Sequence, residues 1–464
     1  MRPTAARRML TWRHLTAPQL FVGSFALLIL VGTLGLQALP GLYTGEPLGL
    51  VDALFTATSA VCVTGLIVVD TATYFTTAGQ AWILLLIQLG GLGMITFATV
   101  IIIALGRRLS LRHEALHRGA ADLSPHVDYR KLTGDVVRFT LILEAVGAAV
   151  LYFAWVPAFG WSGAAFHAIF NAISAFCNAG FSTFSDSLAG FQTQPLTLFV
   201  VMILIVIGGI GFLTLEELYL HRRARRELRQ FRISLHSRLV LLTTVILLLG
   251  GWLVYTALEW RVTLAGMPVW ARPFNSLFMS VTARTAGFNT VDHASASAGT
   301  NFFTILLMSI GGSPGSTAGG MKTTTLALIA LFAWSRFRNR DTTSIWGRSV
   351  PVDTVQRAVG LFAVGFIVMT AAIMAYLAVE LGPAAQPQAT AGFLPYMFEA
   401  ASAFNTVGLS MGVTGDLGVP GRWLTILLMF VGRVGPLTIA AAMALGRTRR
   451  DGRFRFAYED VVVG

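Results

Sequence analysis

The sequence predicts an all-α polytopic membrane protein, and three observations lead to this fold class. Hydrophobic residues make up 55% of the 464 residues and charged residues only 12%, which is not the composition of a soluble protein. Apolar stretches long enough to cross the roughly 30 Å hydrocarbon layer of a bilayer recur along the chain. A short motif centred on a glycine also recurs four times. The lipid bilayer is therefore the expected surrounding of most of the chain.

The basic residues fall in five clusters between the apolar stretches, so the net charge of +12 marks membrane topology rather than nucleic-acid binding. The clusters run from Arg2 to Arg13, Arg107 to Lys131, Arg222 to Arg238, Arg336 to Arg357 and Arg447 to Arg455. The positive-inside rule places all five in the cytoplasm, which predicts eight spans with both termini inside. The first stretch is longer than a secretory signal, so we interpret it as a retained span; a cleaved signal is the alternative.

The recurring motif appears about every 110 residues with the same internal order. It reads TSAVCVTGLIVVD at Thr58–Asp70, ISAFCNAGFSTFSD at Ile173–Asp186, VTARTAGFNTVD at Val281–Asp292 and ASAFNTVGLSMGVTGD at Ala401–Asp416. Each copy follows a moderately apolar run that is too short to cross the membrane and lies between two full spans. Such a run suits a re-entrant helix that enters from outside and returns as an extended loop.

Extended backbone inside a membrane is tolerated only where it is buried in protein or lines a water-filled cavity. A glycine can adopt positive φ, so that successive carbonyls point toward one axis and replace the hydration shell of an alkali cation. One such glycine is more simply a turn, but four in equivalent places favour a selectivity filter. The predicted filter residues are Val63, Thr64, Gly65, Asn178, Ala179, Gly180, Thr285, Ala286, Gly287, Thr406, Val407 and Gly408.

An aspartate follows each glycine at a similar distance: Asp70, Asp186, Asp292 and Asp416. Each one alone is more simply a loop residue or a helix cap. Together they predict a negative outer mouth that concentrates cations, where an anion pore would carry arginine.

The predicted organisation is four parallel M1-P-M2 repeats, that is, eight transmembrane helices and four re-entrant pore helices around one pseudo-four-fold pore. The repeats cover residues 18–115, 130–228, 236–336 and 353–446, and cytoplasmic segments occupy 1–17 and 447–464. Two cysteines, Cys62 and Cys177, exclude a disulfide scaffold and a four-cysteine zinc site, and we interpret both as small buried residues.

The second span of each repeat carries a glycine-rich point: LGGLGMIT at Leu89–Thr96, IGGIGFLT at Ile207–Thr214, IGGSPGSTAGGMK at Ile310–Lys322 and VGRVGPLT at Val431–Thr438. None has the GxGxxG spacing of a dinucleotide site. For the first two we expect only close helix packing through small residues.

The glycine-rich segments of the third and fourth repeats predict a gate on the cytoplasmic side of the filter. Five glycines and a proline within Gly311–Gly320 cannot remain an ordinary helix, so we expect a loop inside the membrane. Arg433 stands where the other repeats have glycine, and a charge within an apolar span is functional by default. The predicted gate residues are Gly311, Gly312, Gly315, Ser316, Thr317, Gly319, Gly320, Lys322 and Arg433.

The buried charges leave alternatives open. Arg433 acts either as an electrostatic barrier or as the partner of a buried carboxylate, and Lys322 either anchors the loop or reaches toward the membrane surface. Arg284 in the third pore helix and Glu399 in the fourth are candidates to brace the filter by pairing.

The motifs VCVTGL, FCNAGF, TARTAGFNT, FNTVGLS and GGSPGSTAGGMK, with the Arg433 span, resemble the Trk/Ktr/HKT superfamily of potassium transporters over nearly the whole chain. The chain is most similar to Ktr-type membrane subunits, because of TGLIVVDTATYF and the tail ending YEDVVVG. The resemblance implies potassium uptake across the bacterial inner membrane, gated by Gly311–Gly320 and Arg433. It also implies a homodimer controlled by a cytosolic ring of nucleotide-binding (ATP/ADP) regulatory subunits, and leaves sodium dependence open.

Other functional classes fit less well. The alternative to a pore is a secondary cation transporter that couples potassium to sodium or proton movement; such folds often have inverted repeats, whereas these repeats are parallel. A membrane enzyme would need a nucleophile-and-base arrangement that the few intramembrane ionisable residues do not supply. Potassium is therefore expected as substrate, and no organic cofactor is expected in this chain.

Overall fold

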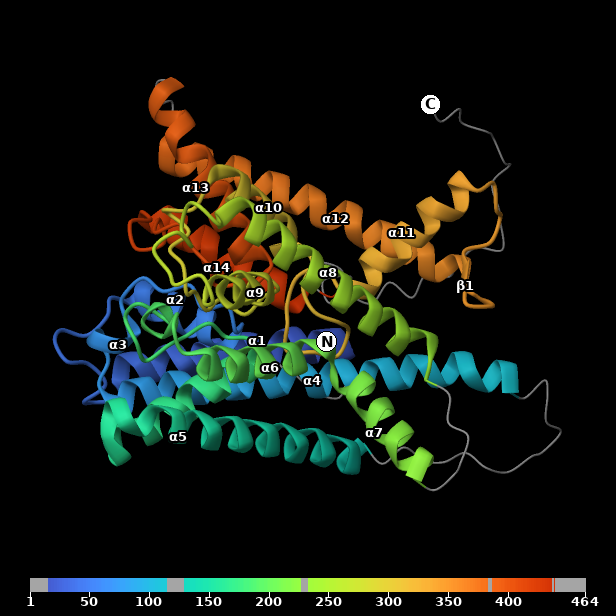
Figure 1. The fold of residues 1–464 in the computed structure, drawn as a ribbon, viewed down its shortest axis with the longest axis horizontal. Coiled ribbons are helices and arrows are strands. Elements are labelled where there is room, and N and C mark those ends of the chain that lie inside the picture. Colours follow the sequence, from blue (N-terminus) through green and yellow to red (C-terminus); the bar gives the residue numbers. More distant parts are fainter. Residues whose placement is uncertain (1–15, 115–128, 227–232, 383–385, 436–437, 439–464) are drawn as a thin grey trace, which may run out of the picture.

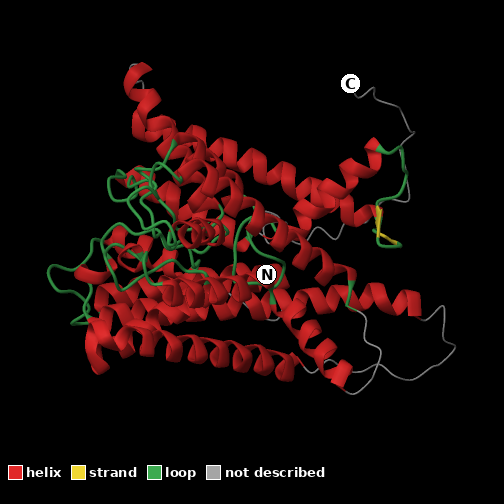
Figure 2. Ribbon diagram, in the orientation of Figure 1, coloured by secondary structure: helices red, strands yellow, loops and turns green. Residues whose placement is uncertain are grey.

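The computed structural model describes residues 16–114, 129–226, 233–382, 386–435 and 438, and these form a bundle made almost entirely of helices (Figures 1 and 2). The basic clusters at 2–13 and 447–455 lie outside the described residues, as do parts of the clusters at 107–131 and 222–238. The first repeat contains α1 (Ala17–Ala38), α2 (Leu50–Val61), the short α3 (Thr71–Tyr74) and α4 (Thr77–Glu114).

The second repeat contains α5 (Tyr129–Cys177), the 3₁₀ turn η2 (Ala189–Phe191), α6 (Pro195–Ile210) and α7 (Phe212–Arg226). Helix α5 consists of two helical segments that meet at a kink at Gly160, whose φ is 70°. The third repeat contains α8 (Leu235–Glu259), α9 (Arg272–Thr282), α10 (Ala298–Met308) and α11 (Thr323–Phe337). A hairpin of β1 (Ser344–Ile345) and β2 (Arg348–Ser349) leads to the fourth repeat, which contains α12 (Val352–Tyr376), the π turn η3 (Leu377–Leu381), α13 (Gln386–Phe404) and α14 (Val419–Val434).

Five of the described helices are long and apolar enough to cross a membrane: Pro18–Ala38, Thr77–Met94, Gly134–Cys177, Leu235–Glu259 and Val352–Leu381. The bent pair α6 and α7 makes a sixth if it is one span. Helices α10 and α11 are too short to count singly because the chain between them, 309–322, is not helical. The expected eight spans thus remain a prediction.

The second glycine-rich point does not have the continuous course that its sequence suggests. Gly208 does pack closely, since a side chain there would meet the carbonyl of Phe176. The helix nevertheless breaks at Gly211, whose φ is 89°, and α7 leaves α6 at 99° (Figure 1). The equivalent stretch of the first repeat lies inside the unbroken α4. Close packing through small residues is therefore present at Gly90 and at Gly208, and the second repeat has a break at Gly211 in addition.

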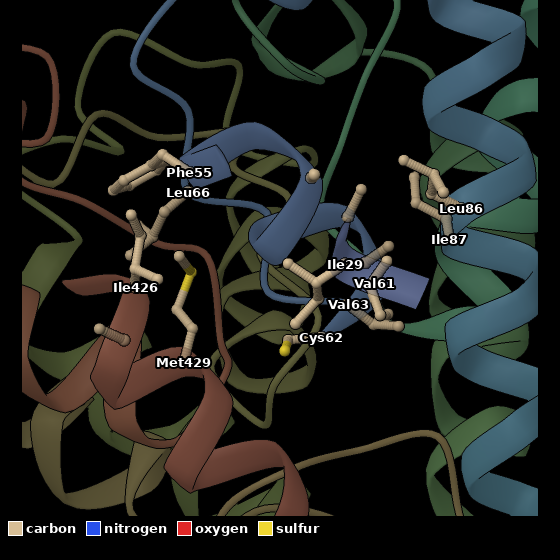
Figure 3. Close-up of a cluster of buried hydrophobic side chains, with 14 of the residues drawn as sticks. Ile29, Phe55, Val61, Cys62, Val63, Leu66, Leu86, Ile87, Ile426 and Met429 are labelled. Carbon is tan, nitrogen blue, oxygen red and sulfur yellow. The ribbon is translucent and has the colours of Figure 1, made fainter. Parts of the chain in front are cut away.

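A hydrophobic cluster joins the first repeat to the last. Figure 3 shows Ile426 and Met429 of α14 beside Phe55 and Leu66 from the α2 region, with Leu86 on α4 in the same cluster. The aromatic residues ten positions before three of the motif glycines, Phe55, Phe170 and Phe398, are fully buried. Burial of large aromatic side chains holds the short helices in place beside the filter loops.

Candidate ion-conduction site

The four motif glycines lie in loops that touch one another in a closed ring. A side chain on Gly65 would collide with the carbonyl of Ala179, one on Gly180 would press on Ala286, one on Gly287 on Val407, and one on Gly408 would collide with Thr64. The contacts therefore run from the first loop to the second, third and fourth and back to the first. All four glycines have positive φ, between 72° and 95°, which favours glycine.

A second left-handed position in each loop was not foreseen from the sequence. The residues two places before the glycines, Val63, Asn178, Thr285 and Thr406, have φ between 49° and 69°. This conformation costs roughly 1–3 kcal/mol for a residue with a side chain, and Val63 is β-branched. Alternation in the sign of φ is a backbone conformation that can turn successive carbonyls toward one axis, as the predicted filter requires.

Side-chain hydroxyls at the ends of the pore helices brace the loops. Ser59, Ser174 and Thr282 donate to the carbonyls of Leu66, Phe181 and Phe288, at 2.7, 2.7 and 2.5 Å. Ser402 instead accepts from the amide of Gly408 at 3.0 Å. The sequence carries a signal for this role that is not among the predictions above, because a serine or threonine stands before alanine near the start of every copy of the motif (TSA, ISA, VTA and ASA).

A cavity of about 230 Å³ opens outside the ring, and all four glycines line it. Asp70 and Asp292 line it too, whereas Asp186 and Asp416 are not among its lining residues. Asp70 caps α3 and also accepts from Ser185 of the second repeat at 2.6 Å. Two of the four predicted outer-mouth aspartates therefore face the cavity.

The chain between α10 and α11 folds as a loop against the filter, in the stretch where glycine content predicts loss of helix. A side chain at Gly319 would collide with the hydroxyl of Thr406, and one at Gly320 would meet Asn405 at 3.0 Å. The loop therefore lies directly against the fourth filter loop. Thr317 donates from its hydroxyl to the carbonyl of Phe176 in the second repeat, at 3.2 Å.

The break between α6 and α7 supplies three of the loop's backbone hydrogen bonds. The amides of Ser313 and Thr317 donate to the carbonyls of Gly209 and Gly208, at 2.9 and 3.2 Å. The amide of Phe212 in turn donates to Gly315 at 3.1 Å. In a continuous α-helix the Phe212 amide would donate to Gly208. The loop thus replaces bonds that a straight helix would make within itself.

Three cationic side chains, the buried Arg433 and Arg284 and the half-buried Lys322, donate to carbonyls of this loop. Arg433 is 1% exposed and donates from Nη1 to Thr317, and Lys322 donates from Nζ to Ala318 at 2.7 Å. Arg284 donates from Nη2 to Gly311 at 3.1 Å. Within the described residues, Nε and Nη2 of Arg433 lack a hydrogen-bond partner, so the alternative of a carboxylate partner gains no support.

The suggested pairing of Arg284 with Glu399 is wrong, because each bonds elsewhere. The Glu399 carboxylate accepts from the hydroxyls of Ser410 and Thr414 at 2.9 and 2.6 Å. Both partners follow Gly408 and line the outer cavity. Glu399 thus braces the fourth loop without Arg284. An ion pair between Arg422 and Asp52, at 2.5 Å, links the fourth repeat to the first on the outer side.

Comparisons with known proteins agree with this arrangement. The family model described as "TrkH: Cation transport protein" matches residues 22–447. The potassium/sodium uptake protein NtpJ of Enterococcus hirae is 36% identical over 97% of this chain and 98% of its own length. The Ktr system potassium uptake protein B of Vibrio alginolyticus is 37% identical over 92% of this chain and 91% of its own.

The crystal structure of the potassium transporter TrkH from Vibrio parahaemolyticus has the same fold, with a TM-score of 0.73 at 20% identity. The match covers 95% of this chain and 87% of that one. Because the family model spans most of the sequence and relatives above 30% identity align almost end to end, the chain belongs to the TrkH family of cation transport proteins.

Proposed function

We propose that this chain takes up potassium across the bacterial inner membrane through the four filter loops. As a family member it is a multi-pass membrane transporter and not an enzyme. The observation that carries the proposal is the closed ring of loops around Gly65, Gly180, Gly287 and Gly408. Relatives named for potassium or potassium/sodium uptake support potassium as the substrate.

The ring has the chemistry of a cation site rather than of an anion site. Its loops bring backbone carbonyls of neighbouring repeats together, and Asp70 and Asp292 make the outer cavity negative. Filter contacts that recur in all four repeats support a pore built of four parallel M1-P-M2 units. Glycine at all four positions favours potassium, because the loops approach so closely that a side chain would displace a neighbouring carbonyl.

The gate in this proposal is the loop 309–322 together with Arg433. The loop lies against the fourth filter loop, and Arg433, Lys322 and Arg284 hold its carbonyls. Positive charge directly on the inner side of a cation filter opposes conduction. Opening therefore requires the loop and the Arg433 guanidinium to move from the path.

Assembly is also part of the proposal. The chain works as a homodimer with a cytosolic ring of nucleotide-binding regulatory subunits, and both termini are cytoplasmic. The words "Ktr system" in the relatives' names support a system of more than one component. Only Val355, Ala358, Ala372 and Tyr376 of α12 are buried in one chain, which leaves a large face of this helix for lipid or a second copy.

Flux of potassium, sodium and chloride into liposomes containing the purified protein tests the function. Selective potassium entry supports the pore; a folded protein that moves neither cation, with or without its regulatory partner, contradicts it. The alternative is a secondary transporter that couples potassium to sodium or protons. A reversal potential set by the potassium gradient alone supports the pore, and one that shifts with the sodium or proton gradient supports coupling.

A further inference from the structure

Glu144 is a buried acid that the filter and the gate leave unexplained. It lies on α5 within the apolar span Gly134–Cys177 and is 3% exposed. An ionisable residue within a membrane span is costly and marks a functional role by default. Its surroundings show what that role is.

The carboxyl group of Glu144 is tied to the second filter loop. Gln88 of α4 donates from Nε2 to Glu144 Oε2 at 2.9 Å. The thiol of Cys177 lies 3.6 Å from Gln88 Oε1 and 3.9 Å from Glu144 Oε1. The acid, the amide and the thiol thus form one buried cluster, which we call the Glu144 cluster.

Cys177 connects the Glu144 cluster to the ion path. It is the last residue of α5 and directly precedes Asn178, whose φ is 60°, and Ala179. The Ala179 carbonyl lies against Gly65 in the neighbouring loop. A displacement of Cys177 therefore moves a filter carbonyl after only one intervening residue.

The α4 helix is shaped to admit the thiol. A side chain at Gly91 would come within 2.7 Å of Cys177 Sγ, so the glycine leaves the slot in which the thiol lies. Cys62 is the equivalent cysteine of the first loop and is also fully buried. Among the contacts of the described residues, only Cys177 of the two lies beside an acid and an amide.

We propose that Glu144 is a positioning residue for the second filter loop: as a hydrogen-bond acceptor it fixes Cys177 and Gln88, and through them the Ala179 carbonyl that selects potassium over sodium. The inference rests on the proposed function. Its readout is the ratio of potassium to sodium flux, which does not depend on how much protein is folded. Wild-type protein without a potassium preference would contradict the proposed function, whereas unchanged variants would contradict only the role of Glu144.

The test compares Glu144→Ala and Glu144→Gln in liposomes. Loss of a hydrogen bond to a buried acid changes an equilibrium constant on the order of tenfold. Glu144→Ala is therefore expected to lower the ratio of potassium to sodium flux by roughly that factor. Glu144→Gln keeps an acceptor oxygen and is expected to retain most of the ratio. Glu259→Ala is the matched control, because Glu259 is also buried but bonds to Thr263 and Ser297 away from the filter.

An unchanged ratio in Glu144→Ala would overturn the proposal. So would a loss in Glu144→Gln as large as in Glu144→Ala, because the acid would then act by its charge. If the Glu144 variants do not fold, Cys177→Ala and Gln88→Met test the same contacts with the acid in place. Both are expected to lower the ratio, and a wild-type ratio in both would overturn the proposal.

Discussion

Arg433 donates from Nη1 to the backbone carbonyl of Thr317, 116 residues earlier in the chain. This bond joins the last described helix to the loop of the third repeat, directly inside the filter. In the gate that we propose, this arginine would both oppose the passage of cations and stabilise the loop that closes the path.

Replacing Arg433 with alanine is therefore expected to raise potassium flux. The change removes the positive charge and a charged hydrogen bond, together worth on the order of a tenfold effect. Liposome flux measures it, and Arg433→Lys, which keeps the charge, is expected to stay near wild type. Equal flux in wild type and Arg433→Ala would mean that the arginine has only a structural role.

Gly65→Ser is expected to lower the ratio of potassium to sodium flux. A side chain at Gly65 collides with the Ala179 carbonyl and is strained at φ 91°, so the ring must widen. Gly93→Ser on α4 is the matched control, because a side chain there meets nothing within 4 Å. If both variants kept the wild-type ratio, the filter assignment would be wrong.

Gly211→Ala is expected to increase flux by releasing the loop. Alanine disfavours the left-handed φ of 89° by about 1–2 kcal/mol and would lie 2.8 Å from the Pro314 carbonyl. The bent form of α6 and α7 then loses stability relative to a continuous helix, in which Phe212 bonds to Gly208 and no longer to Gly315. Flux is compared with that of Gly209→Ala, where the nearest atom to the added carbon is 3.6 Å away. A Gly211→Ala protein no more active than Gly209→Ala would show that the bend does not hold the gate.

Thr282→Val is expected to weaken both selectivity and thermal stability. The substitution keeps the shape of the side chain but leaves the buried carbonyl of Phe288 without its partner, at a cost of about 1–3 kcal/mol. The flux ratio and the unfolding temperature in detergent measure the two effects. Thr370→Val serves for comparison, because Thr370 makes a similar bond on the exposed face of α12. Equal behaviour of the two variants would argue against the hydroxyl braces.

The sequence predicts those features that depend only on nearby residues, such as a glycine with positive φ or a glycine-rich segment that cannot form a helix. Glycine at position 65 and its equivalents indicates positive φ, and the glycines of 311–320 indicate loss of helix, because no partner is needed to disfavour a helix there. Val63 is different, since a β-branched residue disfavours φ of 55° and only the surrounding loops impose it.

The break at Gly211 could not be predicted for a related reason. IGGIGFLT and LGGLGMIT are nearly the same sequence, yet the first is bent and the second lies within α4. The difference comes from the loop 309–322, which bonds to Gly208 and Gly209 from about a hundred residues away. The partners of Arg433, Arg284 and Glu399 are equally distant in sequence or depend on loop geometry, so the sequence indicates these charges but not their contacts.

The ring of filter loops also bears on how the protein is made. The contact between Thr64 and Gly408 joins the beginning of the chain to its end, so the ring cannot close before the fourth repeat has entered the bilayer. If the ring is the filter that we propose, a chain that ends before the fourth repeat would lack one quarter of the ion-coordinating carbonyls. Such a chain is therefore expected not to conduct potassium selectively.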